Sequence, residues 1–216
     1  MRLWTIALMT WFLASQAEAI PYPVNNPKAM VQKQQTATGE HYSLDIRYLD
    51  KMVADIAVHA GNYPVQFDSA ADRTRAVADL ILLSGMLEIV VNGPTPDGGL
   101  LLRYARLNRF GHNLDIPGAT DKAEGSFKRL LAGQPDNPDA NYEYGLFLAS
   151  SGQAALAISY LEKAISLGVS EASYALGMSY LALGDRQKAI AQLQEYQRYH
   201  PKDGNVDKLL AALGQR

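Results

Sequence analysis

The chain has 216 residues, enough for one domain or for one domain with an appendage. Hydrophobic residues make up 48% and charged residues 19%, so the chain is too apolar to be disordered along its whole length. The formal charge of −2 argues against a nucleic-acid binder, and the lack of cysteine excludes disulfide scaffolds, cysteine-ligated zinc, iron–sulfur clusters and thiol catalysis.

The first nineteen residues have the order of a secretory signal peptide. Arg2 precedes an apolar run over residues 3–14, and Ala17 and Ala19 are the small residues of an A-x-A cleavage site. The run is too short to span a bilayer as a helix, although an uncleaved membrane anchor is the alternative. No cysteine is present to carry a lipid anchor. Export of a cysteine-free chain favours the periplasm of a Gram-negative bacterium.

Residues 20–42 are expected to form a flexible tether. Pro21, Pro23 and Pro27 oppose a helix, and the polar residues that follow show no apolar period. A short peptide that becomes ordered on a partner is the alternative. Because no part of the chain shows sustained period-two alternation, no sheet is expected.

Residues 43–99 are predicted to be a helical hairpin followed by a loop. Apolar residues recur at helical spacing over 44–59, with Ser43 as a plausible N-cap. The sequence Gly-Asn-Tyr-Pro at 61–64 is expected to end this first helix.

The second helix of the pair is expected to be capped by Asp68 or Ser69. Its residues 80–91 are apolar nearly all round, which is typical of a helix that is buried. The Pro- and Gly-rich run 92–99 then ends it.

Three glycines begin the same pattern of residues. Gly111, Gly145 and Gly177 lie 34 and 32 residues apart, and each is followed at offsets of 12 and 16 by an alanine and a bulky residue. The spacing resembles the tetratricopeptide repeat family, whose unit of about 34 residues is a pair of antiparallel helices, A and B. The resemblance implies an all-α fold, a short α-solenoid of helix hairpins. The following residues are Ala123 and Phe127, Ala157 and Leu161, and Ala189 and Leu193.

The resemblance divides residues 100–203 into units at 104–137, 138–169 and 170–203, with 204–216 as a capping helix. Each glycine and alanine is expected where two helices approach most closely, and each bulky residue between neighbouring hairpins. Residues 43–91 would stack on the N-terminal side of the first unit as a divergent hairpin.

The sequence carries no recognisable catalytic or metal-binding motif. His112, with Asp115 nearby, is the best candidate for metal or acid–base chemistry, but no second ligand lies at a suitable spacing. Neither a nucleophile elbow nor a phosphate-binding loop is present. We therefore expect no enzyme activity, no metal and no cofactor.

The resemblance also implies which residues line the concave groove, because the family uses the second, fifth, ninth and twelfth positions of each unit. The basic residues of the family's clamp for a terminal carboxylate are missing, so no such clamp is expected. Aromatic residues and methionine favour a hydrophobic or mildly basic peptide instead, although each side chain could simply pack against the next hairpin. The groove positions are Ala105, Asn108, His112, Asp115, Asp139, Tyr142, Leu146, Ala149, Glu171, Tyr174, Met178 and Leu181.

The expected function is that of a non-catalytic scaffold for a protein or peptide partner, with no nucleic acid involved. One alternative is a structural subunit that forms a homo-oligomer through residues 80–91, or through the last hairpin with Tyr196 and Tyr199. A tyrosine-rich surface that binds cell-wall glycan and an enzyme are the minor alternatives.

Overall fold

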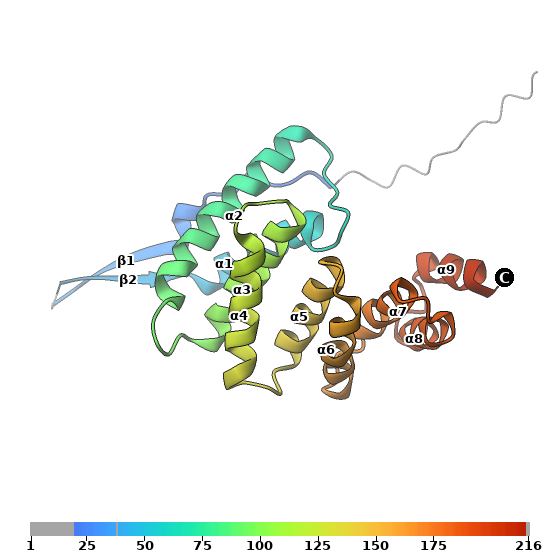
Figure 1. The fold of residues 1–216 in the computed structure, drawn as a ribbon. Helices are drawn as coiled ribbons and strands as arrows, with labels where there is room; N and C mark the ends of the chain where they lie inside the picture. Colours follow the sequence, from blue (N-terminus) through green and yellow to red (C-terminus); the bar gives the residue numbers. More distant parts are fainter. Residues whose placement is uncertain (1–19, 38, 215–216) are drawn as a thin grey trace, which may run out of the picture.

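The computed structural model describes residues 20–37 and 39–214. Apart from one two-stranded ribbon, these residues form helices, and those between residues 98 and 199 pack as a stack of pairs (Figure 1). The predicted all-α solenoid is confirmed as the body of the molecule. The elements are η1 (Pro27–Met30), β1 (Val31–Thr36), β2 (Gly39–Leu44), α1 (Ile46–Ala60), α2 (Ala70–Val91), α3 (Gly98–Asn113), α4 (Ala119–Gly133), α5 (Pro138–Ser150), α6 (Ala154–Ser166), α7 (Ala172–Ala182), α8 (Arg186–Tyr199) and α9 (Gly204–Gly214).

Polar side chains fix where several helices begin. Asp45, Ser69 and Asp97 each accept a hydrogen bond from the backbone N–H three residues further on. The predicted cap at Ser69 is confirmed. The cap at Ser43 is wrong, because Ser43 lies in β2 and Asp45 takes this role.

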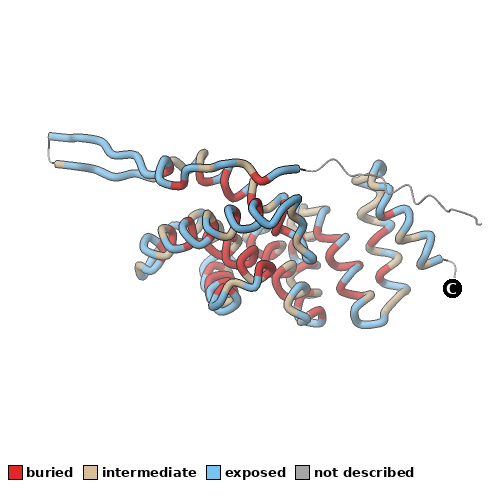
Figure 2. The backbone as a smooth tube through the Cα atoms, turned by 90° about the horizontal axis from the view of Figure 1, so that it is seen from above, coloured by how far each residue is buried: buried red, intermediate tan, exposed pale blue. Residues whose placement is uncertain are grey.

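The expectation that the chain holds no sheet is also wrong. β1 and β2 form an antiparallel ribbon in which Val31 faces Leu44 and Thr36 faces Gly39. The ribbon projects from the helical body, and β1 is exposed along its whole length (Figure 2). A ribbon with no buried face needs no alternation of apolar and polar residues, so the pattern that predicts strands was missing.

The segment before the ribbon is packed rather than a flexible tether. Tyr22 and Met30 are fully buried in the N-terminal core. The Tyr22 hydroxyl donates to an Asp79 carboxylate oxygen (2.9 Å), and Arg75 donates to the Tyr22 carbonyl oxygen (3.1 Å). The predicted cleavage site at Ala17 and Ala19 lies outside the described residues.

Helices α1 and α2 do not pair with each other as the predicted 43–91 hairpin. α2 packs on α3, and α1 packs on α3 and η1. One core cluster joins these four elements, with Met52, Ile56, Leu83, Leu87 and Phe110 among its fully buried side chains.

The three predicted repeat units are the pairs α3–α4, α5–α6 and α7–α8, and the units stack in chain order. The first A helix begins at Gly98, six residues before the predicted boundary at 104. All six alanines and bulky residues of the repeat pattern are fully buried: Ala123, Phe127, Ala157, Leu161, Ala189 and Leu193.

The repeat glycines permit the close approach of A and B helices. A Cβ at Gly145 would lie 2.6 Å from Leu161 Cδ2, and one at Gly177 would lie 2.9 Å from Leu193 Cγ. At Gly111 the nearest atom is instead the Ala119 methyl group, at 2.8 Å. The first unit therefore closes differently from the others, and its turn between the two helices contains Pro117 and Gly118.

Helix α9 covers the end of the stack, with Val206 fully buried beside α8. None of the helices in the described ranges has the length and apolar character needed to span a bilayer.

Candidate functional site

The A helices α3, α5 and α7 lie next to one another along the stack. The predicted groove residues on α5 and α7 therefore share one side of the molecule. We call six of them the α5–α7 strip: Asp139, Tyr142, Leu146, Glu171, Tyr174 and Met178.

The exposed aromatic and apolar part of the strip is on α7. Tyr174 and Met178, which are one helical turn apart, are 38% and 39% exposed. The Tyr174 ring lies 5.3 Å from the Tyr196 ring of α8, which in turn stacks on His200 at 4.2 Å. The Tyr196 hydroxyl donates to Asp203 at 3.4 Å. Three rings thus form a continuous aromatic surface from α7 to the end of α8.

Tyr196 and His200 were not among the predicted groove residues. Tyr196 lies on α8, the B helix of the third unit, whereas the groove positions were predicted almost entirely on the A helices. The signal that could have found it is its aromatic character, since a tyrosine can pack along one ring edge and keep its hydroxyl in water.

The α5 part of the strip is more deeply set. Tyr142 and Leu146 are half-buried and pack against the C-terminal core, as does Leu181 of α7. Burial is the main cause that raises the pKa of Tyr142 to about 12, and the negative charges of Glu143 and Glu171 contribute to this rise. These side chains therefore pack partly against the neighbouring hairpin, which was the alternative to a role in binding.

Two members of the strip are carboxylates. Asp139 and Glu171 stand at the N-termini of α5 and α7, where a negative charge also favours the helix dipole. Both are exposed, and within the described part of the chain neither forms an ion pair with a basic side chain. Glu171 accepts only a hydrogen bond from the adjacent Ser170 hydroxyl, at 3.3 Å.

The first unit does not extend the strip, which corrects the prediction for Asn108. Asn108 is 2% exposed, because α2 covers it. Its Oδ1 accepts from Ser84 of α2 (3.2 Å), and its Nδ2 donates to the Tyr104 carbonyl oxygen (2.8 Å). Ala105 is likewise fully buried.

His112 is half-buried at the junction of the first two units. Its Nδ1 lies 3.0 Å from Thr120 Oγ1, and its ring edge meets Phe147 at 5.3 Å. Asp115 lies in the turn that follows α3, with a left-handed φ of 61°. In the described part of the chain no three histidine or acidic residues gather as metal ligands.

A buried ion network that the sequence analysis missed lies beside the strip. Glu143 of α5 faces both Arg106 (2.6 Å) and Arg109 (2.7 Å) of α3. Arg109 also donates to the Gly61 carbonyl oxygen (2.6 Å), and Asn113 donates to the Ala60 carbonyl oxygen (2.9 Å). The sequence does contain a sign of this network. Arg106, Arg109 and Asn113 are three and four residues apart, and this spacing puts all three side chains on one face of the helix.

This network holds the C-terminal end of α1 against the first unit. The carbonyl groups at the end of a helix lack hydrogen-bond donors within the helix. Arg109 and Asn113 are the donors for two of these carbonyl groups. The positive charge of Arg109 also opposes the rise in the Tyr142 pKa, which places the network next to the strip.

Two surface hollows lie elsewhere. One of about 320 Å³ is lined by residues of α4, α5 and α6, including Lys128, Asn141 and Tyr160. The other, of about 620 Å³, lies at the base of the ribbon and includes Tyr48 and Lys51. Both are open and mixed in polarity, and they bring together no nucleophile with a general base.

Comparison with known proteins bears on the fold. The family model for the anaphase-promoting complex (cyclosome) subunit 3, a family of the tetratricopeptide clan, matches residues 118–196. This match runs from the start of α4 into α8. No curated protein sequence matches the chain.

Solved structures match a larger share of the chain. TTC0263, a thermophilic TPR protein of Thermus thermophilus, is 17% identical with a TM-score of 0.53 over 78% of this chain and 91% of that one. The fold is that of a tetratricopeptide-repeat protein. A MamA protein, MSR-1, is 22% identical with a TM-score of 0.53 over 78% and 86% of the two chains.

YrrB, described as a TPR protein with an unusual peptide-binding site, is 16% identical with a TM-score of 0.51 over 76% of this chain and 82% of its own. At these identities, the likeness establishes the tetratricopeptide fold alone.

Proposed function

We propose that this tetratricopeptide protein is a non-catalytic interaction scaffold that binds a segment of a partner protein along the α5–α7 strip. The observation that carries the proposal is the exposed pair Tyr174 and Met178, next to the Tyr196 ring and the exposed carboxylate of Glu171. Aromatic side chains and methionine are common anchors at protein interfaces. The peptide-binding site described for YrrB supports this use of the fold.

The charge of the strip sets the chemistry of the partner. Asp139 and Glu171 favour a basic residue on the partner, which could also rest on the face of Tyr174 or Tyr196. A terminal carboxylate would be repelled by both acids. The preferred partner segment is therefore apolar with one or two basic residues.

A photo-reactive amino acid at Met178 tests the site in cells that make the protein. The cross-linked adduct should form, and Tyr174→Ala in the same chain should reduce it at least several-fold because the aromatic anchor is lost. The matched control places the same reactive group at Leu156, which is exposed on α6. Equal cross-linking at both positions, or an adduct insensitive to Tyr174→Ala, would contradict the proposal.

The proposed location is the periplasm of a Gram-negative bacterium. It rests on the signal-peptide pattern of residues 1–19 and on the absence of cysteine. Cell fractionation should recover the protein with the periplasmic contents, and its mass should correspond to a chain that begins at Ile20. A chain that retains Met1 and stays in the cytoplasm would rule this location out.

A further inference from the structure

Helix α2 is apolar on two opposite faces, and the chain buries only one of them. The buried face, which includes Leu80, Leu83 and Leu87, packs in the N-terminal core against α3. On the opposite side Ile81 is 54% exposed and Ile89 is 81% exposed. We call this second face the outer stripe: Ala78, Ile81, Leu82, Gly85 and Ile89, which recur at helical spacing.

No charged residue interrupts the outer stripe. Glu88 at one margin is paired with Lys122 of α4 (2.8 Å), and Arg75 at the other contacts Asp72 and the Tyr22 carbonyl oxygen. The charges that flank the stripe are thus directed at their own chain. From Ala78 to Ile89 the helix presents about 16 Å of neutral, apolar surface to solvent.

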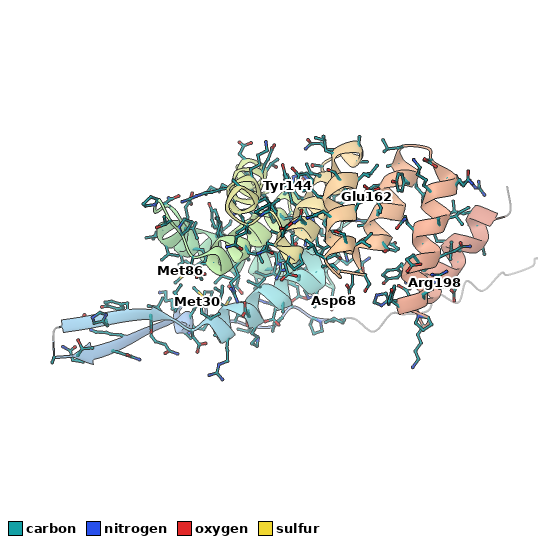
Figure 3. All side chains as sticks on the ribbon, turned by 90° about the horizontal axis from the view of Figure 1, so that it is seen from below. Met30, Asp68, Met86, Tyr144, Glu162 and Arg198 are labelled. Atoms are coloured by element: carbon teal, nitrogen blue, oxygen red, sulfur yellow. The ribbon has the colours of Figure 1, made fainter. Side chains whose placement is uncertain are left out.

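The position of α2 makes this surface unusual for a soluble solenoid. α2 precedes the first repeat unit, at the opposite end of the stack from α8 and α9; Figure 3 shows Met86 of α2 and Arg198 of α8 far apart. The terminal helices of a solenoid need a polar outer face to stay soluble. A contiguous exposed apolar face on such a helix marks an interaction surface.

We propose that a second copy of this chain covers the outer stripe, with α2 packed antiparallel on α2 about a two-fold axis at Gly85. Ile81 and Ile89 lie four residues on either side of Gly85, so the axis brings each Ile81 against Ile89 of the second copy. Beyond the adjacent backbone of α2 itself, a Cβ at Gly85 would meet no atom within 4 Å, and the missing side chain allows the two helices to approach closely. A neutral stripe can pair with itself without bringing like charges together, as an isologous interface requires.

The structure favours this occupant over two others. Head-to-tail stacking of two copies would place the apolar stripe against α9. The exposed residues of α9 include the polar and charged Asn205, Asp207 and Lys208, which do not match an apolar surface. A membrane surface would favour basic residues and large aromatic residues along the helix, and the stripe has neither. These occupants become outcomes of the test.

Sedimentation velocity of the full-length protein tests the proposal. The wild-type chain should show a dimer that grows with concentration, and Ile89→Glu should abolish it because the charge would lie in the apolar contact. Leu156→Glu is the matched control, since Leu156 is exposed on α6. This variant should remain a dimer. Far-UV circular dichroism of each variant confirms that the fold is kept.

A cysteine cross-link tests the two-fold axis itself. The chain has no cysteine, so Gly85→Cys introduces a single thiol that should form an intermolecular disulfide under mild oxidation. Gly125→Cys is the control, because Gly125 is also an exposed glycine inside a helix, with no atom within 4 Å of a built Cβ. It should give no dimer at the same protein concentration.

Several results would overturn the proposal. A chain that is monomeric at every concentration would leave the stripe to a different protein, to a membrane or to residues 1–19. A dimer that survives Ile89→Glu, or one that Gly125→Cys traps as well as Gly85→Cys, would place the contact elsewhere. The test is independent of the proposed peptide site, because Tyr174→Ala should not alter the dimer.

Discussion

Glu143 carries a charge that is almost fully shielded from water, and two arginines of the preceding unit neutralise it. Arg109 has the larger structural role, because it also donates to the carbonyl oxygen of Gly61, the residue that follows α1. Replacing Arg109 with methionine would leave the Gly61 carbonyl group unpaired and Glu143 with a single partner. We expect the free energy of unfolding to fall by about 3 kcal/mol in urea denaturation.

The control for this prediction is an exposed ion pair on α8. Arg198 and Glu195 lie 2.8 Å apart, and the Arg198 side chain is 77% exposed. Arg198→Met should change the free energy of unfolding by less than about 1 kcal/mol, since water competes for both charges. Equal losses in the two variants would show that the buried network has no special role.

Buried tyrosines predict how the protein responds to alkali. Burial raises the pKa values of Tyr104 and Tyr142 to about 12, above the ordinary 10.0. The folded state thus favours the protonated form of both. The stability that this contributes is fully present below pH 10 and is lost as the pH rises through about 12.

Ultraviolet absorbance and circular dichroism, followed together, check this. The absorbance should show a phase near pH 12 from the ionisation of Tyr104 and Tyr142, accompanied by unfolding. Tyr142→Phe should reduce this phase. Ionisation of every tyrosine near pH 10 with the fold intact would contradict the prediction.

The repeat pattern predicted which helix carries each candidate site residue, but not which of these residues stay exposed. Tyr174 and Met178 are on the surface as expected, whereas Asn108 is covered by α2. Repeat offsets give the face of a helix within its unit. They carry no information on what an element outside the repeats places over that face.

Helix pairs were predictable where the sequence spacing corresponds to a physical contact. Gly145 and Gly177 lie at the close contact of their helix pairs, as predicted, but the side chain they meet is the bulky residue sixteen positions on, which was expected between neighbouring hairpins. The ribbon and the segment around Tyr22 were not predictable. The ribbon has no buried face, and a single buried tyrosine between prolines creates no period.

The contact at Gly145 gives a prediction for the α5–α6 pair. Gly145→Ala puts a methyl group into the Leu161 side chain, so we expect a loss of about 1–3 kcal/mol in the free energy of unfolding. Gly125→Ala is the control, because it adds a methyl group in open space within α4. It should stabilise the protein by up to about 1 kcal/mol. Both values are measured by urea denaturation. If Gly145→Ala left the free energy of unfolding unchanged, α5 and α6 could move apart without loss of stability.

At the scale of the whole molecule, the residues that the structure describes form two core clusters along the stack. The first contains the N-terminal elements and most of α3, and the second contains the buried faces of α5, α6 and α7. Each unit packs mainly on its neighbours in the chain. The stability of such a stack is approximately a sum of unit and interface terms, so damage at one end should remain there.

Val206 is the place to test this, because it is fully buried at the C-terminal end of the stack, where α9 meets α8. Val206→Ser should loosen α9 and expose α8, and hydrogen exchange followed by mass spectrometry should show lost protection in α7, α8 and α9. Protection in α1, α2 and α3 should be unchanged, since these helices belong to the other cluster. Leu87→Ala provides the converse change at the N-terminal end. If either variant instead lowered protection evenly along the chain, the two clusters would unfold as one cooperative unit. A partner bound on the α5–α7 strip would then stabilise α2 against unfolding as strongly as α7.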